Sequence, residues 1–157
     1  MAILVKYDGI TGESKVAGFE DHFEVSSFQF GVGRGISSAR GTSTREGTVV
    51  SISEIVVTKA TDGTSIDLLT QACEGKLDKK VEINFVRTGA GQAEMYLKFE
   101  LEGCGISGFS MSSGGDRPSE SVSLNFDKIT MTYSPIGDDL TGSPNTYGWN
   151  LAEDKKV

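Results

Sequence analysis

Two alternating stretches joined by a short turn constrain the fold of this chain most. Residues 79–87 and 93–103 each alternate apolar and polar side chains, and residues 88–92, TGAGQ, lie between them. The apolar positions are Val81, Ile83 and Phe85 in the first stretch and Met95, Leu97, Phe99 and Leu101 in the second. A period of two is typical of a half-buried strand, and a short glycine-containing link joins antiparallel strands as a hairpin. The sequence therefore predicts an antiparallel sheet.

Other segments extend this β-rich pattern. The further predicted strands are residues 2–7, 48–60, 104–113 and 114–135, the last of which turns and then runs long. The apolar parity of the last segment changes between Phe126 and Ile129, so we expect a bend near Asp127 and Lys128.

Residues 22–33 also alternate, but their phase changes. Phe23 and Val25 share one parity, whereas Phe28 and Phe30 share the other. Two explanations stay open: a bulge near Ser26 and Ser27, or a strand that is covered on both faces.

One helix is predicted, over about residues 64–74. Thr64 followed by Asp67 resembles a capping box, and Gly75 is a natural stop signal at the C-terminal end. An apolar stripe at helical spacing consists of Ile66, Leu69 and Cys73, widened by Leu68 and Ala72. We expect this stripe to face the core.

The segment at residues 34–47 differs from its surroundings. It contains three glycines, five serines or threonines and three arginines, with Ile36 as its one large apolar residue. It cannot bury a core face, so an extended loop is predicted. Two alternatives remain for this loop: it stays unordered, or a partner orders it.

The C-terminal tail, residues 135–157, raises a similar choice. It begins with a segment rich in glycine, proline and aspartate, yet it carries Trp149, the only tryptophan of the chain. Either the tail returns to dock on the body of the protein, or Trp149 is an exposed contact for another molecule.

Length and charge limit the class of protein. The 157 residues suit one domain, residues 1–157, with a mainly β, antiparallel sandwich or barrel fold and one helix. A net charge of −7 disfavours binding to nucleic acid and to anionic membranes. The first apolar run is too short for a signal peptide, and no stretch approaches the roughly 20 apolar residues of a membrane helix. We therefore expect synthesis in the cytoplasm without a cleaved signal. Cys73 and Cys104 are expected to be reduced and buried.

The sequence predicts no catalytic residue, cofactor site or metal site. His22 is the only histidine, and no G-x-S-x-G motif supports a catalytic triad around it, so a surface position is expected. One histidine and two distant cysteines give none of the zinc spacings. The GVGRG run at residues 31–35 is neither a dinucleotide fingerprint nor a P-loop. The carboxylates of Glu82, Glu94 and Glu100 are expected on an exposed strand face, and those of Asp138 and Asp139 in a solvated turn.

A resemblance to a known family adds to this description. The stretch GDRPSESVSLNF, a long strand after it and a Gly/Pro-rich tail ending in YGWN resemble the haemolysin-coregulated protein (Hcp) family. GITGESK near the start, the aromatic strand at 28–30, the long loop and the single helix in mid-chain fit the same family, over essentially the whole length. The turn before Asp116 is only SSGG, which departs from the pattern where turn lengths vary readily.

The resemblance implies an antiparallel two-sheet β-barrel flanked by a helix. It also implies a structural role in type VI secretion: six copies form a ring, rings stack into a tube, and some effectors ride inside. The implied partners are further copies of the chain, contractile sheath proteins, a spike protein and secreted effectors. Secretion would run in one step from the cytoplasm.

A ring joins one surface to a different surface on its neighbour, so it needs a protruding element. We expect the extended loop to contact the neighbouring subunit through Arg34, Ile36, Arg40 and Arg45. Gln29 lies between Phe28 and Phe30 and is expected to face the bore of the ring. Tyr147 and Trp149 are expected to anchor the tail.

Two other classes of protein remain. A monomeric β-sandwich binding module, for instance for carbohydrate, would have a similar composition, but it would need exposed aromatic residues, of which only Tyr96 is apparent. A small hydrolase is less favoured because it lacks motifs.

Overall fold

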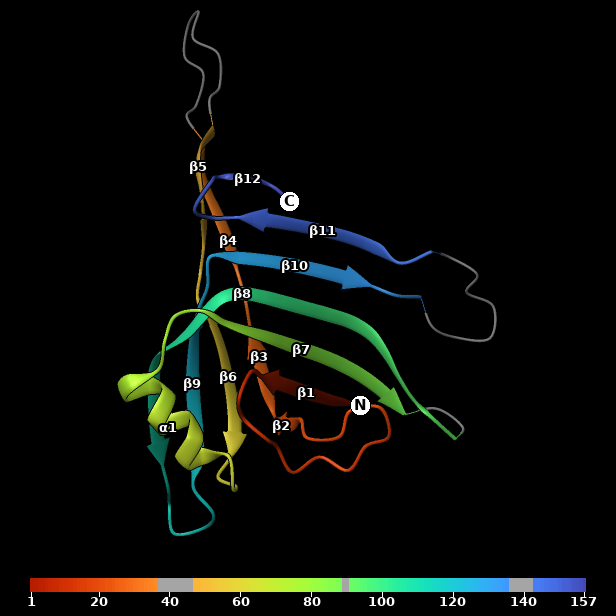
Figure 1. Ribbon diagram of the computed structural model, residues 1–157, viewed down its shortest axis with the longest axis vertical. Coiled ribbons are helices and arrows are strands. Elements are labelled where there is room, and N and C mark those ends of the chain that lie inside the picture. Colours follow the sequence, from red (N-terminus) through yellow and green to blue (C-terminus); the bar gives the residue numbers. More distant parts are fainter. Residues whose placement is uncertain (37–46, 89–90, 136–142) are drawn as a thin grey trace, which may run out of the picture.

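The computed structural model describes residues 1–36, 47–88, 91–135 and 143–157. Within these ranges it contains twelve strands and one helix, α1 (Ser65–Glu74) (Figure 1). The strands are β1 (Ala2–Tyr7), β2 (Phe23–Val25), β3 (Ser27–Gln29), β4 (Val32–Ile36), β5 (Gly47–Ile52), β6 (Ile55–Ala60), β7 (Lys79–Thr88), β8 (Ala93–Ser112), β9 (Ser119–Asn125), β10 (Lys128–Tyr133), β11 (Asn145–Asn150) and β12 (Lys155–Lys156). The protein is therefore mainly β and antiparallel, as the sequence predicts.

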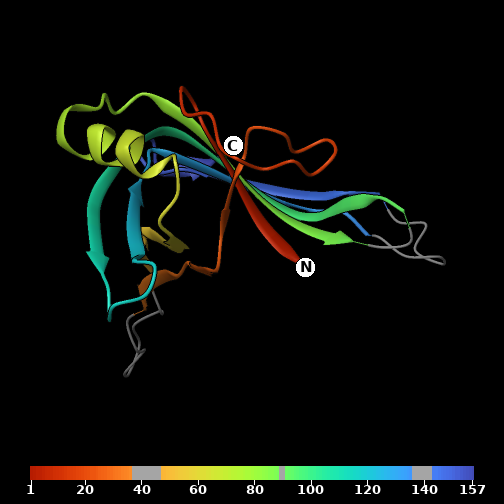
Figure 2. The same cartoon turned by 90° about the horizontal axis from the view of Figure 1, so that it is seen from below.

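The strands form two sheets that share β8. The first sheet has the order β12-β11-β10-β8-β7-β1-β2, and in the second sheet β3, β6, β9 and β8 are neighbours in that order. The strands of the second sheet cross those of the first at a steep angle (Figures 1 and 2). Among the described strands the hydrogen-bonded order does not close on itself, so two antiparallel sheets are present without a closed barrel.

The 20-residue strand β8 turns the corner between the sheets. Its first part pairs with β7 and β10, and its last part pairs with β9. Gly103 lies at this corner with φ +60, where a Cβ atom would come within 2.6 Å of Asp127 Oδ2. A side chain is excluded there both by the backbone conformation and by space. The sequence pattern suggests two strands, 93–103 and 104–113, because the corner interrupts the alternation, but the ladder continues through it.

The phase change in residues 22–33 marks a second crossing between the sheets. β2 pairs with β1 in the first sheet, whereas β3 pairs with β6 in the second. Ser26 lies between them and donates its backbone N–H to Thr58 O at 2.6 Å. The chain therefore changes sheets at Ser26, which explains why Val25 and Phe28 can both face the same core. The bend near Asp127 is also confirmed, since β9 ends at Asn125 and β10 begins at Lys128.

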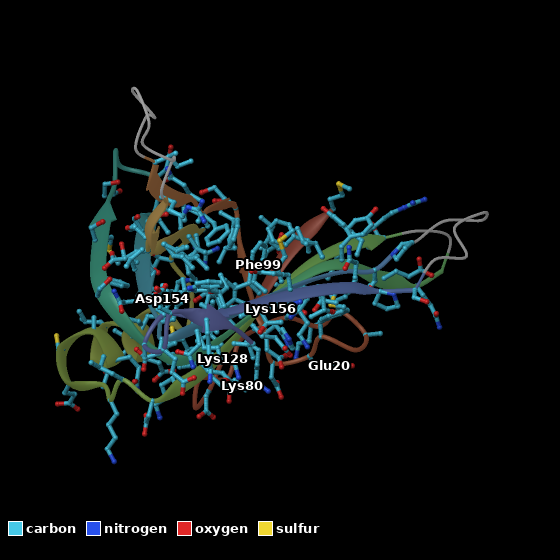
Figure 3. The ribbon with its side chains drawn as sticks, turned by 90° about the horizontal axis from the view of Figure 1, so that it is seen from above. Glu20, Lys80, Phe99, Lys128, Asp154 and Lys156 are labelled. Atoms are coloured by element: carbon cyan, nitrogen blue, oxygen red, sulfur yellow. The ribbon has the colours of Figure 1, made fainter. Side chains whose placement is uncertain are left out.

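The core fills the space between the two sheets. Val81, Ile83 and Leu101 of the predicted hairpin are fully buried there. Phe99 lies near the centre (Figure 3), and its ring centroid is 4.9 Å from that of Phe28. The predicted outward face of residues 79–87 is wrong at Asn84. This residue alternates with the apolar positions and is expected to face outward, but it is only 3% exposed.

The helix begins and ends as predicted, but its start is capped differently. Thr64 makes no side-chain cap hydrogen bond, so the expected capping box with Asp67 is absent. Instead Asp62 Oδ1 accepts a hydrogen bond from the Thr64 backbone N–H at 2.8 Å. Ser65 Oγ accepts a second one from the Asp62 backbone N–H at 3.1 Å. The start of the helix is thus held by the side chains of Asp62 and Ser65 rather than by Thr64 and Asp67.

The face of the helix that packs on the core is also different. Leu68 is fully buried and Ala72 packs against the core. Ile66, Leu69 and Cys73 are exposed, which contradicts the prediction that they face the core. We refer to these three residues as the helix stripe. Cys104 is buried as expected, but Cys73 is not.

The tail is part of the first sheet. β11 pairs along its whole length with β10, so Trp149 lies opposite Ile129. β12 then pairs with the end of β11. The tail therefore returns to the body of the protein as an added strand rather than as a loose segment with one docked side chain.

Candidate assembly surfaces

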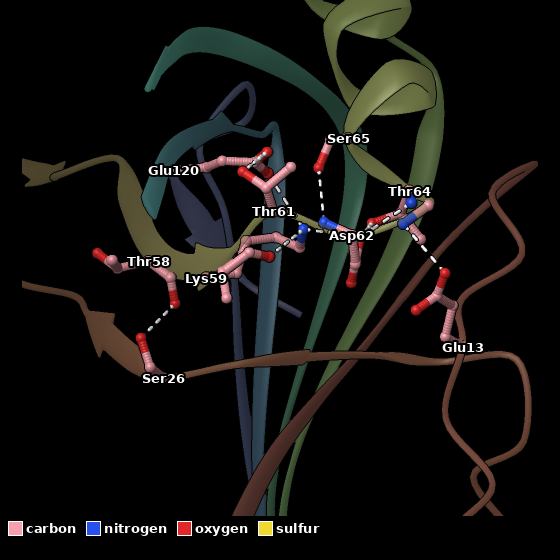
Figure 4. A network of polar contacts seen from close by, with 11 residues as sticks. Glu13, Ser26, Thr58, Lys59, Thr61, Asp62, Thr64, Ser65 and Glu120 are labelled. Carbon is pink, nitrogen blue, oxygen red and sulfur yellow. Dashed lines mark hydrogen bonds and ion pairs between the residues drawn. The ribbon is translucent and has the colours of Figure 1, made fainter. Parts of the chain in front are cut away.

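A buried group of charges joins the second sheet to the start of the helix. Lys59 of β6 and Glu120 of β9 are both fully buried, with 3.1 Å between Lys59 Nζ and Glu120 Oε1. Lys59 Nζ also lies 2.9 Å from Asp62 Oδ1 and donates to Ala60 O at 3.0 Å (Figure 4). The ammonium thus uses its three donors on three acceptors, which is what a buried charge requires.

The carboxylates of this group are held from several sides. Thr61 Oγ1 donates to the second oxygen of Glu120 at 3.0 Å. Burial alone would raise the pKa of Asp62, but hydrogen bonds from Thr64 and Lys59 outweigh it and hold that pKa below its usual value. Asp62 therefore stays ionised while it caps α1. The group fixes β6, β9 and α1 relative to one another.

The sequence carries a signal for this pair. Ile55, Val57 and Lys59 share one parity in β6, and all three are buried. Glu120 likewise shares its parity with Val122 of β9. Opposite charges on the apolar parity of two strands indicate a buried pair, although sequence parity alone does not show which strands are neighbours.

The outward face of the second sheet is lined by small hydroxyl side chains. In one cross-strand row Ser27 pairs with Thr58, Thr58 with Ser121 and Ser121 with Ser110. In the next row Gln29 pairs with Val56, Val56 with Ser123 and Ser123 with Gly108. We call these two rows the hydroxyl face. Neither row contains a charged or an aromatic residue.

Gln29 lies on this face, as its position between two phenylalanines predicts. Gln29 is exposed, whereas Phe28 and Phe30 pack against the core. The sequence identifies the direction of this one side chain. It does not identify the face, because the other residues of the two rows come from strands distant in the sequence.

Both ends of the loop predicted over residues 34–47 belong to strands, β4 at the first end and β5 at the second. β4 and β5 form a two-stranded antiparallel ribbon that continues β3 and β6 and runs past β8, β10 and β11 (Figure 1). Arg34 and Ile36 are exposed on this ribbon. Arg40 and Arg45 lie outside the described residues.

An apolar groove separates the ribbon from the first sheet. It has a volume of about 340 Å³. Its lining residues are Phe30, Val32, Arg34, Val50 and Ile52 from the ribbon side and Ile129, Met131, Tyr147 and Trp149 from β10 and β11. Arg34 is the one charged residue among them. We refer to this surface as the apolar groove.

The two predicted tail anchors differ in this groove. Trp149 packs against the core, and within the described residues its buried Nε1 has no hydrogen-bond acceptor. Tyr147 is 54% exposed and lies opposite Met131 of β10. Its ring faces solvent beside Lys156, whose Nζ lies 5.6 Å from the ring centroid. The contact of β11 with the core is therefore made by Trp149.

Reactive side chains are dispersed in the described part of the chain. No group of three or more His, Cys, Asp or Glu residues there could hold a metal ion. His22 is partly buried on a loop, where its Nδ1 lies 3.0 Å from Glu20 O. Burial raises the pKa of the Cys104 thiol to about 12, so this cysteine is not a ready nucleophile. Within the same residues no helix is long and apolar enough to cross a membrane.

Comparison with known proteins agrees with the fold. A family model described as "Type VI secretion system effector, Hcp" matches residues 4–133. Protein Hcp1 of Pseudomonas aeruginosa is 29% identical over 108 residues, which cover 66% of this chain and 67% of that protein.

Solved structures show the same architecture. A structure titled as that of a type six secretion system protein has a TM-score of 0.89 and 24% identity, covering 99% of both chains. Hcp1 from Salmonella typhimurium has a TM-score of 0.78 and 21% identity, covering 99% of this chain and 98% of that one. Because the family model covers most of the sequence, this chain belongs to the Hcp family of type VI secretion system effectors.

Proposed function

We propose that this protein is the structural subunit of the inner tube of a type VI secretion system. Six copies form a ring, rings stack into a tube, and the tube is expelled from the cytoplasm by a contractile sheath behind a spike protein. In this proposal residues 1–157 act as one domain whose two sheets form the body of a ring subunit. The chain needs no cofactor, nucleic acid or membrane insertion for this role.

The hydroxyl face is the observation that carries this proposal. Its small hydroxyl and amide side chains stay hydrated, and it presents no charge to attract counter-ions or oppositely charged cargo. A wall of this kind suits a bore through which effectors must pass without being held permanently. Gln29 has the longest polar side chain of the two rows, so it is the residue that reaches furthest towards cargo.

The same face argues against a carbohydrate-binding module. Such a module uses exposed aromatic rings on one face to stack on sugars, and the two rows contain none. The exposed rings of Tyr133 and Tyr147 lie on β10 and β11 of the first sheet instead. Tyr96, the one aromatic candidate from the sequence, is partly buried beside Phe85, with ring centroids 6.3 Å apart.

The ribbon β4–β5 supplies the contact with a neighbouring subunit in this proposal. Ile36 is 54% exposed near its far end, and Arg34 lies two residues before it. Arg40 and Arg45 would add cationic contacts to a chain whose net charge is −7. Exposed ion pairs contribute only about 0–1 kcal/mol each, so the apolar contact of Ile36 is the larger contribution.

Size measurement tests the proposal directly. Size-exclusion chromatography with light scattering should give a mass six times that of the 16.7 kDa chain, and negative-stain images should show rings. A monomer at every concentration would overturn the proposal and favour the binding module. Secretion is tested by detecting the protein in culture supernatant with the secretion cluster intact and with it deleted.

The role of the hydroxyl face is tested by a matched pair of substitutions. Gln29→Arg places a cation on the face and should change which effectors are retained by purified rings while the ring mass stays the same. Gln92→Arg makes the same chemical change at an exposed position in the β7–β8 turn and should leave retention unchanged. Equal retention by both variants and the wild type would remove Gln29 from the bore.

A further inference from the structure

The helix stripe is an apolar surface that the fold leaves uncovered. Ile66 is 71% exposed and Leu69 is 45% exposed, and Cys73 is exposed one helical turn further on. These positions have the spacing of one helix face, which is why the sequence predicts them in the core. The core takes the neighbouring face through Leu68 instead. A stripe of this kind with no partner among the described residues indicates a partner outside the chain.

The charges on the helix are of one sign. Asp67 lies in the first turn of α1 and Glu74 is its last residue, and the helix contains no lysine or arginine. The first basic residue after it, Lys76, follows the C-terminal cap. The helix stripe is therefore flanked by negative charges along the length of the helix.

The apolar groove has the complementary character. Met131 is 42% exposed and Val32 is 58% exposed on its two sides, and Trp149 forms part of its floor. Two cations lie at the groove: Arg34 lines it, and Lys156 lies over the ring of Tyr147 at its edge.

These two surfaces cannot meet within one chain. In Figure 1 the helix lies at the lower left, whereas β10 and β11, which form one side of the groove, lie in the upper part of the molecule. An apolar surface with negative flanks and an apolar groove with positive edges, placed apart on one molecule, are the two halves of a heterologous contact.

We propose that α1 of one copy docks its helix stripe into the apolar groove of a second copy. Ile66 and Leu69 enter the groove beside Met131 and Val32, and Asp67 and Glu74 approach Arg34 and Lys156. This inference rests on the proposed assembly of identical subunits and names the surfaces that join them. The contact differs from the one proposed for Ile36, because it uses the helix rather than the far end of the ribbon.

The exposed thiol of Cys73 allows a direct test. In a Met131→Cys variant, mild oxidation of the assembled protein should join Cys73 of one copy to position 131 of the next by a disulfide. Cys104 is buried and stays out of this reaction. The measurement is a ladder of linked chains on a non-reducing gel, with the linked peptides identified by mass spectrometry.

Two control variants define the background. Ser110→Cys places a thiol on the hydroxyl face, where no link to Cys73 is expected. Met131→Cys combined with Cys73→Ser should give no ladder, because the helix then has no thiol to offer. A Cys73 link at position 110 as strong as at position 131 would overturn the proposal.

Charge reversal provides an independent readout. Asp67→Arg should raise the concentration at which half of the assembly dissociates by about tenfold or more, and adding Arg34→Asp should restore most of the loss. Both positions are exposed, so circular dichroism should show a folded chain in each variant. Absence of rescue, together with an unchanged assembly in Leu69→Lys, would overturn the proposal.

Light scattering under reducing conditions distinguishes a failure of the docking inference from a failure of the proposed tube function. If the cysteine variants assemble but position 131 does not link to Cys73, the docking inference is wrong and the proposed tube function stands. If no variant and no wild-type sample assembles at any concentration, both are wrong.

Discussion

Lys59 and Glu120 form an ion pair that is sealed from solvent, with 3.1 Å between the ammonium and the carboxylate. A buried pair of this kind gains little over an apolar pair of the same size, but removing one partner leaves the other charge uncompensated. The pair therefore acts chiefly as a constraint on structure. It allows β6 and β9 to pair in one register only, with the start of α1 fixed beside them.

Neutralising one member of this pair should be costly. Glu120→Gln is expected to lower the free energy of unfolding by about 3 kcal/mol, because Lys59 keeps its charge in a buried site with only Asp62 as a counter-ion. Urea unfolding measures the change. Glu100→Gln is the matched control, since its carboxylate lies 3.0 Å from Lys98 Nζ with both side chains partly in solvent. That change should cost at most about 1 kcal/mol. Equal losses in the two variants would contradict the prediction.

Trp149 should contribute more to stability than its neighbour Tyr147. Trp149→Ala is expected to cost about 3 kcal/mol, near the low end for aromatic core residues because the ring is only partly buried. Tyr147→Ala should cost less than about 1 kcal/mol, since that ring is mostly in solvent. As the only tryptophan, Trp149 also reports its own environment, and its emission should move to longer wavelength on unfolding. Emission that is already at long wavelength in the folded protein would show that β11 is not held on the core.

Cys104 should be protected from alkylation until the protein unfolds. Burial raises the pKa of its thiol to about 12, so the reactive thiolate is scarce near neutral pH. In a Cys73→Ser variant Cys104 is the sole thiol. Its labelling by iodoacetamide at pH 8 should then follow the rate of global unfolding and accelerate with urea. Rapid labelling without urea would mean that β8 opens locally at its corner.

Stability should fall in alkaline solution, in two overlapping windows. Burial raises the folded-state pKa of Tyr7 from 10.0 to about 12, and that of Cys104 from 9.0 to about 12. The unfolded chain therefore releases these protons at lower pH than the folded chain. Each group lowers the free energy of unfolding by about 1.4 kcal/mol per pH unit, between pH 9 and 12 for Cys104 and between pH 10 and 12 for Tyr7.

Tyr7→Phe isolates one of these windows. Within the described residues the Tyr7 hydroxyl is buried without a partner, so its removal at pH 7 should change stability by less than about 1 kcal/mol. Between pH 10 and 12 the variant should lose stability less steeply than the wild type. Parallel curves for the two proteins would assign the alkaline loss to other groups.

The strands could be read from the sequence because alternation is a local signal. β7, the start of β8 and the bend before β10 all follow from the positions of apolar residues in single segments. The crossing of the chain between sheets at Ser26 could not be read in the same way. A change of parity in the sequence is the only local indication of this crossing, and a bulge produces the same change. Only the pairing partners of β2 and β3 distinguish a crossing from a bulge.

The helix shows where local patterns mislead. Ile66, Leu69 and Cys73 match the template for a core stripe better than Leu68 with Ala72, and yet the latter pair packs inward. Periodicity identifies an apolar face but not what covers it. An apolar stripe required by a partner copy would have the same spacing as one required by the core.

The sequence identifies single residues of the assembly surfaces, whereas the fold determines which residues lie together in each surface. Gln29 and Arg34 could be selected from their neighbours in the chain. The hydroxyl face and the apolar groove each combine at least three separate segments, so they exist only once the sheets have formed. The role of Gln29 in a bore stays a prediction.

The shared strand β8 has a mechanical consequence. Because one unbroken backbone of 20 residues belongs to both sheets, a force that pulls on either sheet is carried by covalent bonds into the other. The two sheets are then expected to yield together in a single event rather than as separate unfolding units. If the subunit is expelled under load as proposed, its resistance is governed by the rate of that one event. A single-molecule pulling experiment should accordingly record one rupture peak per chain.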